Sequence, residues 1–185
     1  GVIRAGGVLA PLSTLLNPES LARLIEDSSS RFVFATTPHE PLVLPIADQL
    51  QDCRRIAVGF EAEGWTGYED FIANASEDTP WVKTVDQDEC VVIYSSGTTG
   101  VPKGIVQTQH SRSNMAQGMG LEFRIHSGST VVISTPLFSN ATWATLLPSM
   151  AAGGLTVVLP AFDPEVFLKA VEEEKASHIF LVPTQ

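Results

Sequence analysis

The sequence predicts an α/β fold, a doubly wound and mostly parallel sheet with flanking helices. Six short apolar runs, rich in Val, Ile and Phe, hardly alternate in polarity: RFVFA (31–35), RIAVGF (55–60), CVVIY (90–94), TVVIST (130–135), LTVVLP (155–160) and HIFLVP (178–183). Such runs are typical of parallel strands that are covered on both faces. Amphipathic stretches separate them, and repeated strand–helix–strand units imply right-handed crossovers with helices on the sheet faces.

Two of the expected helices have clear start signals. Asn17-Pro18-Glu19 combines an N-cap residue, a proline at the first helical position and an early acid, which predicts a helix over about 18–28. Asp163-Pro164-Glu165 repeats this signal and predicts a helix that ends near residue 175. Hydrophobic spacing predicts further helices over 41–51, 67–74, 111–120 and 140–152.

Two stretches interrupt this alternation. Residues 61–89 are rich in Glu, Asp, Gly and Thr and predict a long surface excursion, and a fresh strand–helix series begins after GLEFRIHSGS (120–129). We therefore expect a first α/β subdomain over 1–125 and the truncated beginning of a second α/β subdomain over 126–185. The ends at Gly1 and Gln185 suggest that the chain is part of a longer protein.

The composition, 44% hydrophobic and 17% charged over 185 residues, is typical of a soluble globular protein. The net charge of −10 repels phosphodiester backbones and predicts no nucleic-acid partner. No apolar run approaches the roughly 20 residues of a transmembrane segment, and we expect a cytoplasmic protein. Cys53 and Cys90 have no CxxC spacing, which predicts buried thiols in a reducing compartment and no metal site.

The stretch YSSGTTGVPKG (94–104) follows the apolar run CVVIY and predicts a phosphate-binding loop. Such a loop needs glycines that let backbone N–H groups converge, hydroxyl donors and a cation. The stretch supplies all three through Ser95, Ser96, Gly97, Thr98, Thr99, Gly100 and Lys103. Residues 90–126 hold three basic side chains and one acidic one, a local charge of +2, so the remainder carries −12.

The loop differs from the Walker A pattern GxxxxGK[ST]. With Gly97 as the first glycine, Lys103 falls in register, but Pro102 replaces the second glycine and Gly104 the metal-binding hydroxyl. The next residues, GIVQTQ, predict a strand, so no helix dipole lies behind the phosphates. We expect hydroxyls, N–H groups and the lysine to hold the anion. The alternative is a flexible serine and glycine turn between two strands.

The segment VIYSSGTTGVPKG (92–104) resembles the AMP-binding signature of the adenylate-forming superfamily, which includes acyl-CoA synthetases, adenylation domains of nonribosomal peptide synthetases and luciferases. Weaker likeness extends along the chain in the family's order, at residues 4–37, at TPLF (135–138) and at LVPTQ (181–185). The resemblance therefore covers nearly the whole chain and implies part of the large N-terminal domain of such an enzyme.

Enzymes of this superfamily let a carboxylate attack the α-phosphorus of ATP, release pyrophosphate and form an acyl-adenylate, which coenzyme A often captures. The resemblance therefore implies ATP, Mg²⁺ and coenzyme A as cosubstrates and a small-molecule carboxylic acid, such as a fatty acid, as substrate. In this chain it implies that the loop holds the β- and γ-phosphates, with Thr98, Thr99 and Lys103 as the expected direct contacts.

One motif departs from the acyl-CoA synthetase pattern PLFHxxG. The chain reads PLFSNAT, with Ser139 in place of the histidine and Thr142 in place of the glycine. PLF itself favours the acyl-CoA branch. Ser139, Asn140 and Trp143 are candidates for the acid pocket, but an ordinary helix start with Trp143 in the core explains the same residues.

A second departure lies just after the loop. Gln109 stands where the family often has histidine, and the next residue, His110, is expected to be a surface residue without a catalytic role.

The later motifs of the superfamily, GYGxTE, YRTGD and the catalytic lysine of the C-terminal domain, do not occur in these residues. The catalytic residues are therefore unknown, and we expect the chain to be inactive alone. Two alternatives stay open: an amino-acid or aryl-acid adenylation domain, and a non-catalytic nucleotide-binding module. Apolar faces that normally pack on missing strands lead us to expect self-association of the fragment.

Overall fold

The computed structural model describes residues 1–95 and 102–185, which form two compact units. The first unit comprises Gly1–Lys83 and Tyr94–Ile105, and the second comprises Thr84–Ile93 and Val106–Gln185. These units reflect packing within this chain alone, and the predicted division into 1–125 and 126–185 stays a prediction.

The first unit contains a three-stranded parallel sheet in the order β1-β2-β3, with Phe34 of β1 opposite Ile56 of β2. In chain order its elements are the 3-10 turn Ile3–Ala5, α1 (Pro18–Asp27), β1 (Phe32–Thr36), η2 (Thr37–His39), α2 (Glu40–Val43), η3 (Leu44–Leu50), β2 (Arg54–Val58), β3 (Thr66–Gly67) and α3 (Tyr68–Ile72).

Helix α1 forms where the start signal predicts it. Asn17 Oδ1 accepts a hydrogen bond of 2.8 Å from the backbone N–H of Ser20, and Pro18 takes the first helical position, where no N–H is needed. Leu21 and Ile25, four residues apart, lie on the buried face of the helix. The capping residue and the spacing of the apolar side chains are thus both consistent with this ten-residue helix.

The predicted helix over 41–51 is interrupted. It divides into the α-helix α2 and the 3-10 helix η3, and Pro45 follows the first residue of η3. Because proline has no N–H to donate to the preceding turn, it breaks the continuous α-helical ladder.

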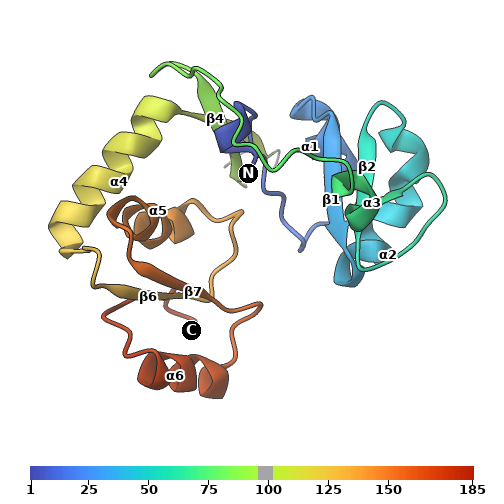
Figure 1. Ribbon diagram of the computed structural model, residues 1–185. Coiled ribbons are helices and arrows are strands. Elements are labelled where there is room, and N and C mark those ends of the chain that lie inside the picture. Colours follow the sequence, from blue (N-terminus) through green and yellow to red (C-terminus); the bar gives the residue numbers. More distant parts are fainter. Residues whose placement is uncertain (96–101) are drawn as a thin grey trace. The chain divides into compact units, whose positions relative to one another are not determined.

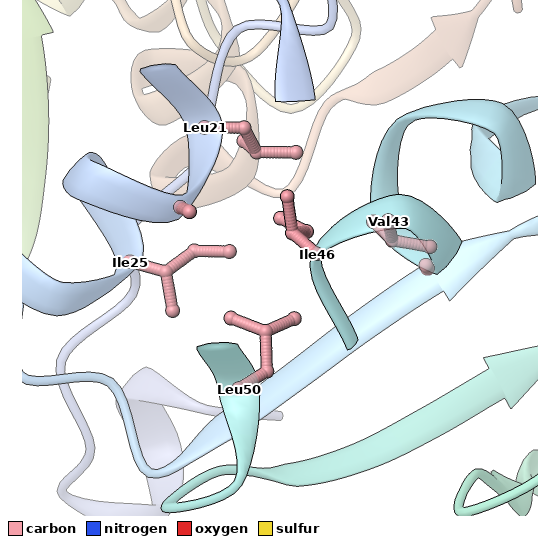
Figure 2. Packing of buried hydrophobic residues seen from close by; sticks show 7 residues of the cluster. Leu21, Ile25, Val43, Ile46 and Leu50 are labelled. Carbon is pink, nitrogen blue, oxygen red and sulfur yellow. The ribbon is translucent and has the colours of Figure 1, made fainter. Parts of the chain in front are cut away.

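The core of the first unit lies between α1, β1, α2 and η3. Figure 2 shows Leu21 and Ile25 of α1 pointing toward Ile46 and Leu50 of η3, with Val43 of α2 beside them. Leu50 and Ile46 are each only 2% exposed. Burying side chains of this size contributes about 1.5–3 kcal/mol each, which fixes α1 on the sheet.

The two faces of β1 have different partners because successive side chains of a strand alternate in direction. Ala35 is buried in the core cluster, whereas Phe32 and Phe34 pack edge-on against Phe71 of α3, with ring centroids 6.2 and 5.8 Å apart. The guanidinium of Arg54 lies 4.9 Å from the centre of the Phe71 ring.

The second unit contains a three-stranded parallel sheet in the order β7-β6-β8. The elements that follow α3 along the chain are β4 (Glu89–Ser95), β5 (Lys103–Thr108), α4 (Gln109–Phe123), β6 (Thr130–Ile133), η4 (Asn140–Thr142), α5 (Trp143–Ala152), β7 (Leu155–Val158), α6 (Pro164–Glu173) and β8 (His178–Phe180). Strands β4 and β5 pair with each other in a separate two-stranded sheet, and each has residues in both units.

Strand β6 lies at the centre of its sheet, and helices cover both faces. Figure 1 shows α5 on one side of β6 and β7 and α6 on the other, and α5 in turn packs against α4. Val131, Val132 and Ile133 are at most 1% exposed. The predicted α/β class is therefore confirmed, with parallel strands covered by helices.

The two cysteines differ in burial. Cys90 is 1% exposed, as expected, but Cys53 is only half-buried, which corrects the prediction of a second fully buried thiol. Both are free, and burial raises the pKa of each thiol above its ordinary value. Among the described helices, none combines the length and the apolar character that a membrane span requires.

Replacing Leu50 by Ala is expected to lower the free energy of unfolding by about 2–5 kcal/mol, because it leaves a cavity between α1 and η3. Leu15→Ala is the matched control, since Leu15 is 86% exposed and its removal leaves no cavity. Urea unfolding of the two variants measures the difference. Equal midpoints would contradict the assignment of Leu50 to the core.

A candidate phosphate and acid site

The phosphate-loop candidates begin where β4 ends. Ser95 is the last residue of β4 and is half-buried, and Lys103 is the first residue of β5 and is exposed. The other candidates, Ser96, Gly97, Thr98, Thr99 and Gly100, lie outside the described residues. The structure thus places Lys103 at a strand start, where the sequence suggested a loop position, and it confirms the strand expected over GIVQTQ.

Buried side chains hold β4 in place. Cys90 and Val91 are at most 1% exposed, and Cys90 donates its S–H to the backbone carbonyl of Gln107 on the neighbouring strand, with a sulfur–oxygen distance of 3.4 Å. Among the described residues Lys103 makes no ion pair. Its ammonium group is therefore available to an anionic ligand.

Tyr94, immediately before Ser95, ties this strand to α1. Its hydroxyl donates to the carboxylate of Asp27 at 2.6 Å and lies 3.4 Å from the carbonyl oxygen of Leu24. Burial, reinforced by the Asp27 carboxylate, raises the pKa of Tyr94 well above its ordinary value, so the hydroxyl stays a donor at physiological pH. Because these partners are 67 residues apart, nothing in the local sequence pattern indicates the contact.

Helix α4 begins directly after β5 because Thr108 caps it. The backbone N–H of Ser111 donates to Thr108 Oγ1 at 3.2 Å, and Ser111 Oγ accepts from the Thr108 N–H at 3.1 Å. This reciprocal capping box starts the helix at Gln109, two residues earlier than expected. His110 is exposed, as expected, and its Nε2 is 2.8 Å from the side-chain nitrogen of Asn114.

The PLFSNAT segment forms a turn that is stabilised by hydrogen bonds from side chains at its end to its own backbone carbonyls. Thr142 Oγ1 donates to the carbonyl of Pro136 at 2.7 Å and lies 2.9 Å from Thr135 Oγ1. The indole N–H of Trp143 donates to the carbonyl of Leu137 at 2.9 Å. Thr142 is fully buried, and its hydroxyl forms hydrogen bonds that the glycine of the family pattern, which has no side chain, could not form.

The three acid-pocket candidates in this turn differ in how exposed their side chains are. Asn140 is exposed and Ser139 is half-buried, whereas Trp143 is only 4% exposed. The Trp143 ring lies under the guanidinium of Arg112, 4.9 Å from the ring centre. Trp143 is thus a core residue of the second unit, and contact of these three residues with an acid stays a prediction. No sequence pattern around Arg112 indicates this contact.

Curated relatives match the chain from end to end. It is 27% identical to 4-hydroxybutyrate–CoA ligase 2 of Metallosphaera sedula, with 100% of the chain and 35% of that protein aligned. It is 29% identical to feruloyl-CoA synthase of an Amycolatopsis species, with 98% of the chain and 34% of that protein aligned. The chain therefore spans about a third of the length of these relatives.

Solved structures agree on the fold. The inhibitor-bound N-terminal domain of FACL13 from Mycobacterium tuberculosis matches with a TM-score of 0.81 and 26% identity, over 97% of this chain and 44% of that one. The long-chain-fatty-acid-CoA ligase FadD1 from Archaeoglobus fulgidus matches with a TM-score of 0.87 and 22% identity, over 98% of this chain and 36% of that one.

The model of the AMP-binding enzyme family matches residues 1–185, the whole chain. The signature at 92–104, the α/β units and the curated CoA ligases all agree with this match. The chain belongs to the AMP-binding enzyme family.

Proposed function

We propose that the protein to which this chain belongs activates a carboxylic acid with ATP and then transfers the acyl group to coenzyme A. The family match over residues 1–185 carries the proposal. The curated relatives bear the names of CoA ligases or synthases for acids as different as 4-hydroxybutyrate, ferulate and long-chain fatty acids. These names support a small-molecule carboxylic acid as substrate and coenzyme A as acceptor.

In the first step a carboxylate oxygen attacks the α-phosphorus of ATP and the bond to pyrophosphate breaks, which leaves an acyl-adenylate. In the second step the sulfur of coenzyme A attacks the acyl carbon, AMP leaves, and the thiol proton is released. Negative charge develops on the departing pyrophosphate. The exposed ammonium of Lys103 would stabilise it together with the hydroxyls of the motif.

The acid itself would lie against the turn that Thr142 and Trp143 close, with Ser139 and Asn140 toward it. The reaction also uses Mg²⁺ in this proposal. Among residues 1–95 and 102–185 no three His, Cys, Asp or Glu side chains come together as a metal-ligand set. These residues thus offer no such set for the ion. A cytoplasmic location and self-association of the isolated chain stay predictions.

In the parent protein, Lys103→Ala is expected to lower adenylation by roughly 10–10³-fold, because one electrostatic donor to the leaving group is lost. Acid-dependent exchange of labelled pyrophosphate into ATP measures this step. Lys169→Ala is the control, since Lys169 is an exposed lysine of α6 that pairs with Glu173 of the same helix. An unchanged exchange rate in the Lys103 variant would refute the assignment.

Tyr94→Phe in the parent protein is expected to raise the KM for ATP by roughly 3–30-fold and to leave the KM for the acid unchanged. Without the hydroxyl, β4, which ends at Ser95, is no longer hydrogen-bonded to Asp27. One hydrogen bond to a charged group contributes about 1.5–3 kcal/mol at most, which limits the expected effect. The other tyrosine, Tyr68, provides the matched control Tyr68→Phe. Equal KM values for ATP in the two variants would show that Tyr94 does not position the motif.

The 185-residue chain alone is expected to form no acyl-adenylate, whereas the parent protein forms it from ATP and an acid. Mass-spectrometric detection of the adenylate, or of the hydroxamate made from it with hydroxylamine, compares the two at equal concentration. Turnover by the isolated chain would show that these residues suffice for catalysis. A coenzyme A thioester from the parent would distinguish a CoA ligase from an enzyme that loads a carrier protein.

A further inference from the structure

Asp27 lies where the electrostatic field of its own helix disfavours a carboxylate. It is the last residue of α1 and follows Glu26, and the last turn of this helix holds no basic side chain. Because the C-terminus of a helix carries partial negative charge, an acid there lowers the stability of the helix. Among residues 1–95 and 102–185 no basic side chain forms an ion pair with Asp27. The energetics of α1 alone therefore do not explain this residue.

The side chain of Asp27 accepts a hydrogen bond from Tyr94. The phenolic hydroxyl donates to Asp27 Oδ2 at 2.6 Å, and Tyr94 immediately precedes Ser95, the first candidate of the phosphate motif. Without this acceptor the hydroxyl is left with weaker contacts, such as the carbonyl oxygen of Leu24 at 3.4 Å. Since a hydrogen bond to a charged group is stronger than one between neutral groups, the Asp27 carboxylate is the acceptor that best fixes the end of β4 on α1.

The turn that follows Asp27 is itself held by side-chain hydrogen bonds. Ser28 Oγ donates to the backbone carbonyl of Ile25 at 2.9 Å and lies 2.7 Å from Ser30 Oγ. The Cys53 thiol, from the loop before β2, donates to the backbone carbonyl of Ser30 with a sulfur–oxygen distance of 2.9 Å. These bonds fix the backbone at the end of α1, so the Asp27 carboxylate is presented from a well-supported position.

We propose, on the basis of the function proposed above, that Asp27 is a positioning residue for ATP. Through the Tyr94 hydroxyl it fixes the strand end from which the glycine-rich motif starts, and it does not touch the substrate itself. Asp27, Tyr94 and Lys103 belong to the same compact unit, so the contact acts within that unit. A strand end that is already held in place loses less conformational freedom when ATP binds, which strengthens binding. The unfavourable place of Asp27 in its helix is then explained by function, as expected of a residue that breaks a local rule.

Titration calorimetry of the parent protein with ATP tests this proposal, because it measures binding without turnover. Asp27→Ala is expected to raise the Kd for ATP by about 3–30-fold, as Tyr94→Phe does, since both changes remove the same hydrogen bond. The double variant is expected to bind ATP no more weakly than either single variant, because the two residues act through one contact. Asp27→Asn keeps an acceptor oxygen and is expected to retain part of the affinity.

Glu26→Ala is the matched control. It removes an exposed carboxylate from the same last turn of α1, and the hydrogen bonds of the Tyr94 hydroxyl described above go to Asp27 and Leu24. This variant is expected to bind ATP as the wild-type protein does. Equal Kd values for ATP in the Asp27→Ala and Glu26→Ala variants overturn the inference.

The double variant provides a second decision. If Asp27→Ala weakens ATP binding by the same factor with and without Tyr94→Phe, Asp27 does not act through Tyr94 and the inference is overturned. Should Asp27→Ala not fold, the same comparison with Asp27→Asn decides. If ATP binds as expected but no carboxylic acid supports pyrophosphate exchange, the proposed function fails and the positioning role of Asp27 stands. If the wild-type protein does not bind ATP, both fail.

Discussion

Parallel strands cannot be joined by a tight turn, and this constraint organises both units. Helices lie in the connections from β1 to β2, from β6 to β7 and from β7 to β8, and they cover the sheets because the buried strands are apolar on both faces. In the second unit β6 is enclosed in this way by α5 and α6. The loop from β6 to α5 therefore lies at the carboxyl end of the strand, and this loop is the PLFSNAT segment.

Hydrogen bonds between side chains and loop carbonyls then shape the ends of these elements. The Thr142 hydroxyl and the Trp143 indole donate to backbone carbonyls of the PLFSNAT segment and so stabilise the loop between β6 and α5. The Tyr94 hydroxyl ties the strand before the glycine-rich motif to α1, whose own position is set by the core between α1 and η3. Burial of Leu50 and Ile46 is thus connected, through α1, to the strand that leads to Ser95.

Local sequence patterns predicted most of the fold. The six apolar runs all became strands, and the signals at Asn17 and Asp163 marked the starts of α1 and α6. The two-residue strand β3 escaped prediction because it has no apolar run and exists only through its pairing with β2. The division of the 41–51 helix follows from a proline within it, which hydrophobic spacing alone does not register.

The sequence by itself determined the α/β class, the motif at 92–104 and the family, because these depend on residue types at fixed short spacings. Only the tertiary structure paired Tyr94 with Asp27 and stacked Arg112 on Trp143, since these partners are 67 and 31 residues apart and no periodicity relates them. It also decided that Arg112 is buried and that no carboxylate of residues 1–95 and 102–185 pairs with it. Burial depends on what the rest of the fold places around a side chain, which no local pattern contains.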